Sequence, residues 1–338
     1  MPTTDTQAKN RAPQASVRRV WVALHTVLLT AMLFVPGLAD AARLTVLVVM
    51  TEHGPAYEEV LGSMRATLAN AQDKKLSLHA ITTDEFTQDG ARTPDRNAPD
   101  LVVTVGTDAA MAVMQTQPAV PVYCSFLPQP AYAMLVNRAR GEQVRVSALY
   151  LDQPFVRQLH LIRLALPAHA RIGVVLGPES RKNERALRNA VSAVGATLRV
   201  EQISDEKQLI GALHQVMDKA DILLAVPDPL VFNRNTAQNV LLTTYRLGKP
   251  VAGYSRAYVT AGALLSVYST PAQIGRQIGE ELLAMQDRPG RALPAPGYPR
   301  YFSVEINERV ARSLGIEPGQ ADDLTRRLVE KTAGSSHE

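Results

Sequence analysis

Short, continuously apolar runs alternate with segments of helical spacing along almost the whole chain. Continuous rather than alternating apolarity indicates strands that are buried on both faces, as in a parallel sheet. Regular alternation of strand and helix then predicts an α/β fold with right-handed crossovers. The expected strands are residues 44–49, 76–81, 101–105, 120–126, 146–151, 171–176, 198–203, 222–226, 251–254, 263–268 and 301–306.

The segments between these strands carry apolar residues at three- and four-residue steps. In one of them Leu187, Ala190, Val191 and Val194 form a single stripe, which would pack against a sheet. The expected helices are residues 56–71, 108–115, 155–166, 181–194, 205–219, 233–247, 271–285, 307–314 and 321–331.

About ten strands are more than one open sheet comfortably holds in a chain of this size. We therefore expect two sheets of about five strands, each in its own lobe and flanked by helices. Residues 127–147 lack a clear period and include Pro128, Pro130 and Gly141, so this segment is predicted to cross between the lobes. A second segment rich in Pro and Gly, residues 288–299, joins the long helix to the last strand.

The N-terminal residues resemble an export signal. Arg18 and Arg19 precede an apolar run that starts at Val20, and an A-x-A pattern ends at Ala41. This layout predicts a cleavable signal peptide over residues 1–41. The apolar run is shorter than the roughly 20 residues that a spanning helix needs. No Cys lies near the cleavage site. We therefore expect a periplasmic protein that is not a lipoprotein.

Composition and missing motifs exclude several functions. The formal net charge is only +4, which does not favour a nucleic-acid partner. A single cysteine, Cys124, rules out an intrachain disulfide framework; it lies within an apolar strand and is predicted to be a core residue. The sequence has no HExxH, GxGxxG, GxxxxGK[ST] or GxSxG motif. It therefore predicts no catalytic residue, no cofactor and no metal site.

Ligands of open parallel sheets bind beyond the carboxyl ends of the strands. This rule selects candidate ligand-binding residues in loops of both halves. Several have a structural alternative: Thr107 and Asp108 can cap a helix, Glu52 and His53 can form a solvated loop, Asp228 can fix a turn between two prolines, and Tyr254 can fill a sheet edge. The candidates are Thr51, Glu52, His53, Gly106, Thr107, Asp108, Ser125 and Phe126 in the first half, and Glu179, Ser180, Pro227, Asp228, Tyr254 and Ser255 in the second.

Three stretches of the C-terminal half carry a family resemblance through their order and spacing. They are ADILLAVPDPLVFN (220–233), GKPVAGYSRAYVTAGALLSVYSTPAQIGRQIGEELL (248–283) and FSVEINERVARSLGIEP (302–318). The stretches 102–115 and 120–130 match more loosely. The chain thereby resembles the ABC transporter substrate-binding proteins of the group that includes tryptophan- and tyrosine-type binders.

The resemblance implies a type I periplasmic binding fold, with two Rossmann-like lobes, three crossing segments and a ligand in the cleft between the lobes. It implies that the strand 263–268 and the helix 271–285 return to the first lobe. The implied division is a signal peptide (1–41), a first lobe (42–147 and 256–292), a second lobe (148–255 and 293–331) and a frayed tail (332–338). It places the candidate residues along the cleft. The family's usual Gly-Asn-Val-Thr-Gly turn is replaced by residues 140–147.

The function implied is that of the substrate-binding component of an ABC-type uptake system. A monomer would bind a small organic ligand, an amino acid as the first expectation, by hinge closure and deliver it to a membrane permease. A periplasmic sensing module that signals to a membrane receptor or histidine kinase needs the same fold and is the alternative.

Overall fold

The computed structural model describes residues 44–71, 76–89, 98–139, 144–166, 171–233, 235–286, 288 and 292–334. The predicted signal peptide lies outside the described residues, as do residues 140–143 of the predicted first crossing. Within the described ranges no helix is long and apolar enough to span a membrane. The predicted tail begins too early, because the last helix, α13 (Ala321–Gly334), continues past residue 332.

The first sheet has the strand order β2-β1-β3-β4-β5, and all its strands run parallel. Its strands are β1 (Leu44–Met50), β2 (Leu76–Thr82), β3 (Leu101–Val105), β4 (Val122–Leu127) and β5 (Val146–Tyr150). This confirms the expectation of a parallel sheet flanked by helices.

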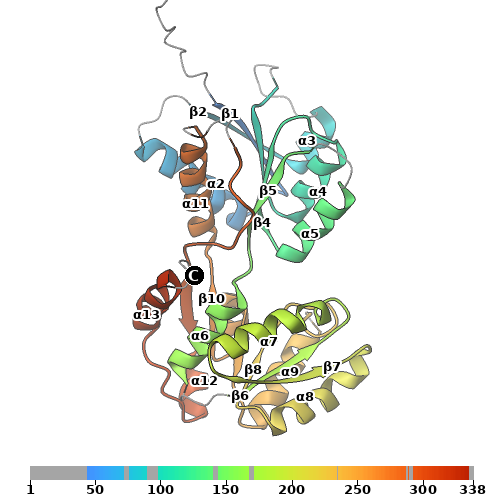
Figure 1. The fold of residues 1–338 in the computed structure, drawn as a ribbon, viewed down its shortest axis with the longest axis vertical. Coiled ribbons are helices and arrows are strands. Elements are labelled where there is room, and N and C mark those ends of the chain that lie inside the picture. The colour runs from blue at the N-terminus through green and yellow to red at the C-terminus, as the bar shows by residue number, and fades with distance from the viewer. Residues whose placement is uncertain are drawn as a thin grey trace, which may run out of the picture. The chain divides into compact units, whose positions relative to one another are not determined.

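Both faces of the first sheet are covered by helices, which explains why its strands are continuously apolar (Figure 1). Along β1, Val46 and Val48 pack under α2 (Pro55–Asn70) and α11 (Pro271–Gln286). The alternate residue Leu47 points to the other face, under α3 (Thr83–Asp89), α4 (Thr107–Gln115) and α5 (Gln129–Arg138). Successive side chains along β1 thus enter the two cores on opposite faces of the sheet, and neither face requires polar residues.

The second sheet has the order β11-β10-β9-β8-β6-β7. Its strands are β6 (Arg171–Leu176), β7 (Thr197–Gln202), β8 (Ile222–Leu224), β9 (Val251–Gly253), β10 (Leu265–Tyr268) and β11 (Ser303–Ile306). The strands run parallel except β11, which is antiparallel to β10 at the sheet edge.

Two helical layers cover the second sheet. One core lies under α6 (Phe155–Ala165), α7 (Glu184–Ala193), α12 (Glu308–Ser313) and α13. The other core lies under α8 (Leu209–Asp218) and α9 (Thr236–Arg246). The short helices η1 (Arg181–Asn183), η2 (Glu206–Gln208) and α10 (Arg256–Ala261) complete the elements of this part of the chain.

The expected return of the strand 263–268 to the first lobe is wrong. This strand is β10, and it pairs with β9 and β11 in the second sheet. Leu265 and Val267 complete the apolar core beneath α6 and α13, so this strand is needed where it lies. Only the following helix, α11, returns to the first sheet, where it lies beside α2 (Figure 1).

The predicted boundary at residue 147 also differs from the structure. It cuts β5, which pairs with β4 in the first sheet from Val146 to Tyr150. Residues 127–147, predicted as a crossing, contain α5 instead. Pro128 and Pro130 stand at the start of this helix, where a missing N–H costs no hydrogen bond, so they begin the helix rather than break it. The chain crosses between the sheets at three other places: after β5, after β10 and before β11.

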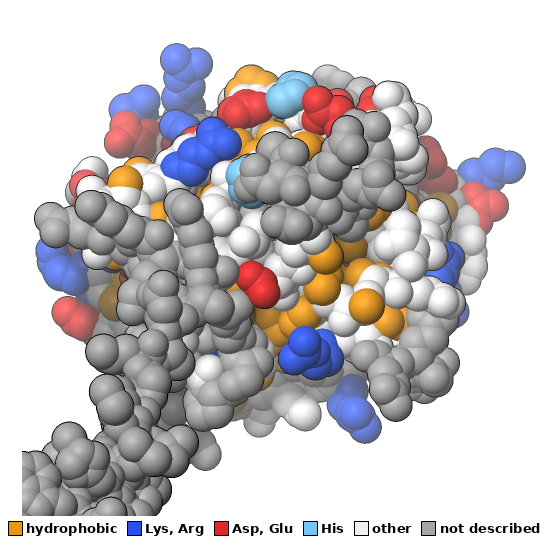
Figure 2. Space-filling view, turned by 90° about the horizontal axis from the view of Figure 1, so that it is seen from above, with side chains coloured by type: hydrophobic (Ala, Val, Ile, Leu, Met, Phe, Trp, Pro, Cys, Tyr) orange, Lys and Arg blue, Asp and Glu red, His pale blue; other side chains and the backbone are white. Residues whose placement is uncertain are grey.

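The face of the molecule in Figure 2 carries charges of both signs. Among its described side chains, acidic and basic groups are interspersed around exposed hydrophobic atoms. A mixed surface of this kind agrees with the small net charge of the chain.

Candidate functional site

A pocket of about 280 Å³ lies at the carboxyl ends of three strands of the second sheet. Val226 and Pro227 follow β8, Tyr254 and Ser255 follow β9, and Tyr268 and Ser269 lie at the end of β10. The rest of the described lining comes from the first crossing segment, 151–153, the first residues of α5, the helix α6 (Phe155 and Gln158), Asn183 and Tyr298. This is the position at which parallel sheets bind ligands.

Aromatic side chains make up much of the apolar lining, and four of them come from different parts of the chain: Phe155, Tyr254, Tyr268 and Tyr298. The Tyr254 hydroxyl donates to the Tyr258 hydroxyl at 3.0 Å, and the Tyr268 hydroxyl donates to Glu305 Oε2 at 3.1 Å. Burial raises the pKa of both phenols, so they stay neutral at physiological pH. The rings therefore offer apolar faces with fixed polar tips.

The polar groups of the lining come chiefly from the first crossing and the start of α6. Asp152 Oδ2 accepts the backbone N–H of Gln129, at the first turn of α5. Gln158 donates its amide N–H to the Gln153 carbonyl at 2.9 Å, and its side-chain oxygen is buried without a hydrogen-bond partner. Burial raises the pKa of the Asp152 carboxyl.

A buried polar network beneath the pocket joins the three crossing segments. Arg157 Nη1 donates to Gln153 Oε1 at 2.6 Å in the first crossing and to the Pro299 carbonyl at 2.8 Å in the third. Gln153 Nε2 donates to Ser269 Oγ at 2.9 Å in the second. The Arg157 guanidinium also lies 4.2 Å from the centre of the Phe302 ring. Burial lowers the pKa of Arg157 to about 10, so it remains charged at neutral pH.

Three of the second-half candidates line the pocket: Pro227, Tyr254 and Ser255. Ser255 also caps α10 by accepting the Tyr258 N–H at 3.4 Å. Asp228 and Ser180 are held elsewhere. Asp228 Oδ2 accepts the Ser180 N–H at 2.8 Å and the Glu179 N–H at 3.2 Å, while Oδ1 accepts the Leu230 N–H at 2.9 Å.

The Asp228 carboxylate thus ties the loop after β6 to the loop after β8. It is only 3% exposed. Gly177 is required beside it, because a Cβ at this position would lie 2.2 Å from Asp228 Oδ1. Ser180 is buried and accepts the Gly177 N–H at 3.0 Å, whereas Glu179 is exposed. The turn-fixing alternative for Asp228 matches these contacts.

The first-half candidates lie at the carboxyl ends of β1, β3 and β4, and none of them lines this pocket. Thr51 packs against Gly106, which has a φ of 107°. A Cβ at Gly106 would lie 2.2 Å from Thr51 Oγ1, so glycine is needed for both backbone and space. Ser125 is buried and donates to the Thr104 carbonyl at 2.7 Å.

The other first-half candidates are more exposed. Glu52 and His53 are solvent-exposed, and His53 pairs with Glu58 at 2.8 Å. Thr107 and Asp108 stand in the first turn of α4, whose N-cap is Gly106 and has no side-chain hydrogen bond. Helix capping, the alternative for these two residues, is therefore not observed. Phe126 has a positive φ of 56° and meets the Tyr57 ring edge-on at 5.7 Å between centroids.

Sequence reasoning missed several lining residues, namely Asp152, Gln153, Gln158, Asn183, Tyr268 and Tyr298. Asp152 and Gln153 follow β5, so the strand-end rule could have selected them from the predicted strand 146–151. Tyr298 lies in an irregular Pro- and Gly-rich segment and has no local signal. Its position depends on the third crossing.

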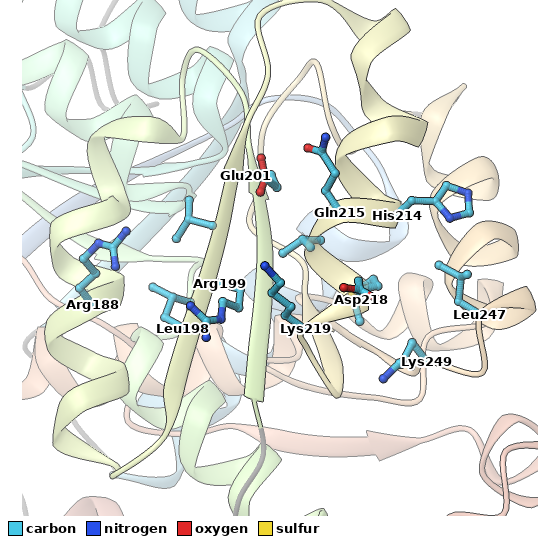
Figure 3. A pocket seen from close by; sticks show the side chains of 13 residues that line it. Arg188, Leu198, Arg199, Glu201, His214, Gln215, Asp218, Lys219, Leu247 and Lys249 are labelled. Carbon is cyan, nitrogen blue, oxygen red and sulfur yellow. The ribbon is translucent and has the colours of Figure 1, made fainter.

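A larger groove of about 1130 Å³ lies along the outer strand β7 (Figure 3). Its lining includes Arg188, Arg199, Lys219 and Lys249. Lys219 and Lys249 precede β8 and β9, so this groove lies toward the amino ends of those strands. Strand ends of this kind are not where parallel sheets place ligands, and we assign the site to the smaller pocket.

Neither cavity has the residues of a metal centre. Within the described residues no three His, Cys, Asp or Glu side chains gather in a way that could hold an ion. Cys124 is buried in β4, and burial raises the pKa of its thiol to about 12.

The sequence matches the family model of the ABC transporter substrate binding protein over residues 49–287. A comparison with curated proteins gave no match. The fold is similar to that of a conserved domain protein from Vibrio cholerae, at 22% identity and a TM-score of 0.54, over 84% of this chain and 98% of that one.

Two further structures share the fold at 17% identity. One is the ABC domain from Streptococcus pneumonia in complex with L-Trp, with a TM-score of 0.54 over 84% of this chain and 98% of that one. The other is a substrate binding protein with adhesive properties from Clostridium difficile, in its ligand-free, open structure, with a TM-score of 0.64 over 82% and 96%.

The similarity to these solved structures establishes the fold. The family model matches more than half of the chain and therefore establishes the family. Members of this family are solute-binding proteins of ABC transporters rather than enzymes. The chain belongs to the ABC transporter substrate-binding protein family.

Proposed function

We propose that this protein binds a small organic ligand in the 280 Å³ pocket and delivers it to the membrane permease of an ABC-type uptake system. The observation that carries the proposal is the composition of the pocket. Four aromatic side chains and a few converging polar groups meet at the carboxyl ends of β8, β9 and β10. Small-molecule sites have this combination of apolar walls and few, well-placed polar groups.

The three crossing segments support binding by hinge closure. The Arg157 network joins all three of them directly below the pocket. A ligand that contacts Gln153 or Ser269 therefore touches the residues about which the lobes would turn. Only contacts that differ between the open and closed states shift such an equilibrium.

A thermal-shift screen of the purified protein tests the binding function. The screen should include amino acids, amines, sugars and small organic acids. A ligand at about 100 times its Kd adds roughly 2.7 kcal/mol to the free energy of unfolding. For a chain of this length that raises Tm by about 4 °C.

Two variants decide between the cavities. Tyr298→Ala removes a pocket ring that is 39% exposed and so has little role in the core. Arg199→Ala removes a cation from the outer groove. We expect Tyr298→Ala to weaken binding of the ligand found in the screen and Arg199→Ala to leave it unchanged. The opposite pattern would move the site to the groove.

We further propose that residues 1–41 are a cleavable signal peptide and that the protein works as a periplasmic monomer. The support is the sequence pattern that ends at Ala41. N-terminal sequencing of the exported protein should begin at Ala42. Uptake of the labelled ligand by cells with and without the gene tests delivery. Normal uptake with a lost transcriptional response would instead support the sensing alternative.

A further inference from the structure

Two of the sheet edges in this protein are covered by other parts of the chain. At the edge strand β11, the Val304 N–H donates to Thr325 Oγ1 of α13 at 3.2 Å. Beside β5, Gly297 donates its N–H to the Ala148 carbonyl and accepts the Tyr150 N–H, both at 2.9 Å. Covering an edge in this way prevents it from pairing with a strand of another chain.

The edge strand β7 has no such cover in the part of the chain that the structure describes. The Ile203 N–H donates to the Leu176 carbonyl at the end of β6. Because the direction of the backbone groups alternates along a strand, Leu198, Val200 and Gln202 direct their N–H and C=O groups away from β6. Outside the ladder of β6 and β7, none of the described hydrogen bonds uses the backbone groups of these three residues. We call this side of β7 the open edge.

Two charged side chains of opposite sign lie along the open edge. Residues 198–201 line the outer groove of about 1130 Å³, and among them Arg199 is exposed and Glu201 is partly buried (Figure 3). The two side chains are on the same face of the sheet, because they are two residues apart. None of the ion pairs among the described residues includes either of them.

We propose that the open edge pairs with the open edge of a second copy of this chain, antiparallel and centred on Val200. Arg199 then lies opposite Glu201 of the second copy, and Glu201 lies opposite Arg199 of the second copy, so the pairing forms two ion pairs. Leu198 lies opposite Gln202 of the second copy. The outward backbone groups of these residues and of Val200 form about six hydrogen bonds across the two-fold axis.

Charge selects this register over its neighbours. A symmetric antiparallel pair is centred on one residue, because opposite residues direct their backbone groups the same way. If the centre moved to Arg199, two arginines would lie opposite each other, and at Glu201 two carboxylates would do so. Like charges directly opposite each other destabilise a strand pair, whereas opposite charges stabilise it. The sequence of β7 is therefore complementary to itself only when Val200 is the centre.

A second copy suits the open edge better than a uniformly charged partner does. The charged residues of the groove lining are of both signs: Arg188, Arg199, Lys219, Lys249, Glu201 and Asp218. An acidic partner would meet Glu201 with like charge. No described residue of β7 lines the ligand pocket, so each copy keeps a complete site. Small interfaces associate weakly, so the monomer remains the ligand-binding unit, and the inference is independent of the proposed function.

Sedimentation velocity of the purified protein over a series of concentrations tests the pairing. We expect a reversible equilibrium of monomer and dimer with a Kd of roughly 0.1 mM, as for other small interfaces. A single monomeric species at all concentrations up to about 1 mM would overturn the proposal.

Charge-reversal variants connect the dimer to the named side chains. Arg199→Glu places like charges opposite each other at both ion pairs, and Glu201→Arg does the same, so each should raise the Kd for dimerisation by roughly 30-fold. The double variant R199E/E201R restores opposite charges and should return the Kd to within about threefold of the wild-type value. Circular dichroism checks that the variants fold. A dimer that survives the single reversals, or that the double variant does not restore, overturns the proposal.

A matched control makes the same charge change away from the open edge. Arg185 is exposed in α7 and is not part of the groove lining, so Arg185→Glu should leave the Kd for dimerisation within about threefold of the wild-type value. An increase equal to that of Arg199→Glu would mean that net charge rather than the strand pairing controls association, which would overturn the proposal.

A backbone variant and a peptide probe complete the test. Val200→Pro removes an N–H that points away from β6, so the ladder inside the sheet is kept while the central hydrogen bonds of the dimer are lost. An unchanged dimer in folded Val200→Pro would overturn the proposal. Poly-L-glutamate is the probe for another occupant. If the wild type stays monomeric and binds this peptide, and Arg199→Glu does not bind it, the open edge is a site for acidic peptides and the second copy is excluded.

Discussion

The packing of α11 on α2 depends on one residue without a side chain, Gly275. A Cβ at this position would lie 2.1 Å from the backbone oxygen of Val60 and 3.0 Å from Ser63 Cβ. The same helix pair is joined by a hydrogen bond from Ser63 Oγ to the Ala272 carbonyl at 2.7 Å. A Cβ added at Gly279, one turn further along α11, would likewise lie 2.8 Å from Thr67 Cβ. The two helix backbones therefore approach as closely as glycine allows.

Gly275→Ala should destabilise the protein by about 3 kcal/mol. Overpacking a core costs typically 1–3 kcal/mol, and this substitution lies at the upper end because the atom that must give way belongs to the backbone. Relief of the clash requires α2 and α11 to separate by roughly 1 Å, which opens space beside Val60 and Met64. With an unfolding entropy of about 2.1 cal/mol/K per residue, the expected fall in Tm is about 5 °C.

Differential scanning calorimetry of the purified protein measures this shift, with Gly62→Ala as the matched control. Gly62 lies in α2, is exposed, and an added Cβ there meets nothing within 4 Å. Alanine is the better helix former, so Gly62→Ala should raise stability by up to about 1 kcal/mol. A Tm of Gly275→Ala equal to or above that of the wild type would refute the close-packing argument.

Three further predictions follow from the contacts of single side chains. Asp228→Ala leaves three backbone N–H groups without their acceptor and should lower the free energy of unfolding in urea by about 3 kcal/mol. Asp108 is exposed, so Asp108→Ala should change this free energy by no more than ~0.5 kcal/mol. Equal effects of the two substitutions would contradict the structural role of Asp228. The hydrogen bond to Glu58 raises the pKa of His53, so the pair stabilises the fold below the unfolded pKa of His53 and loses this effect as pH rises through the folded pKa. An NMR titration should show that Glu58→Gln lowers the His53 pKa. An unchanged His53 pKa would show that the two side chains do not interact in solution. Cys124 should resist a thiol reagent in the native protein and react in denaturant, because its thiol is buried and its pKa is raised to about 12; full labelling of native protein would show that β4 is accessible.

Local sequence patterns predicted most elements but not where every strand belongs. The apolar runs marked β1, β3 and β6 well, because two-sided burial removes polar residues from a strand. The helix α5 was missed, since Pro128 and Pro130 look like breakers when the helix start is unknown. The resemblance placed β10 in the wrong sheet, and the apolar run itself could not correct this, because it carries no information about which neighbouring strand it pairs with.

The residues of the ligand site were also predicted only in part. Strand-end logic selected Pro227, Tyr254 and Ser255, which line the pocket. It also selected Asp228, which accepts three backbone N–H groups instead. The sequence around an acidic loop residue is the same whether its carboxylate faces a ligand or the backbone. Strand-end logic passed over Asp152, although this residue follows the predicted strand 146–151.

The sequence by itself determined that this chain builds layered α/β sheets and that ligand groups gather after the strands, because burial and turn chemistry are properties of neighbouring residues. The tertiary structure alone decided which loops share one pocket. Asp152, Tyr254 and Tyr298 are far apart along the chain, and they line one cavity because two sheets and three crossings bring them there. Such contacts are set by strand order and packing, which no local pattern records.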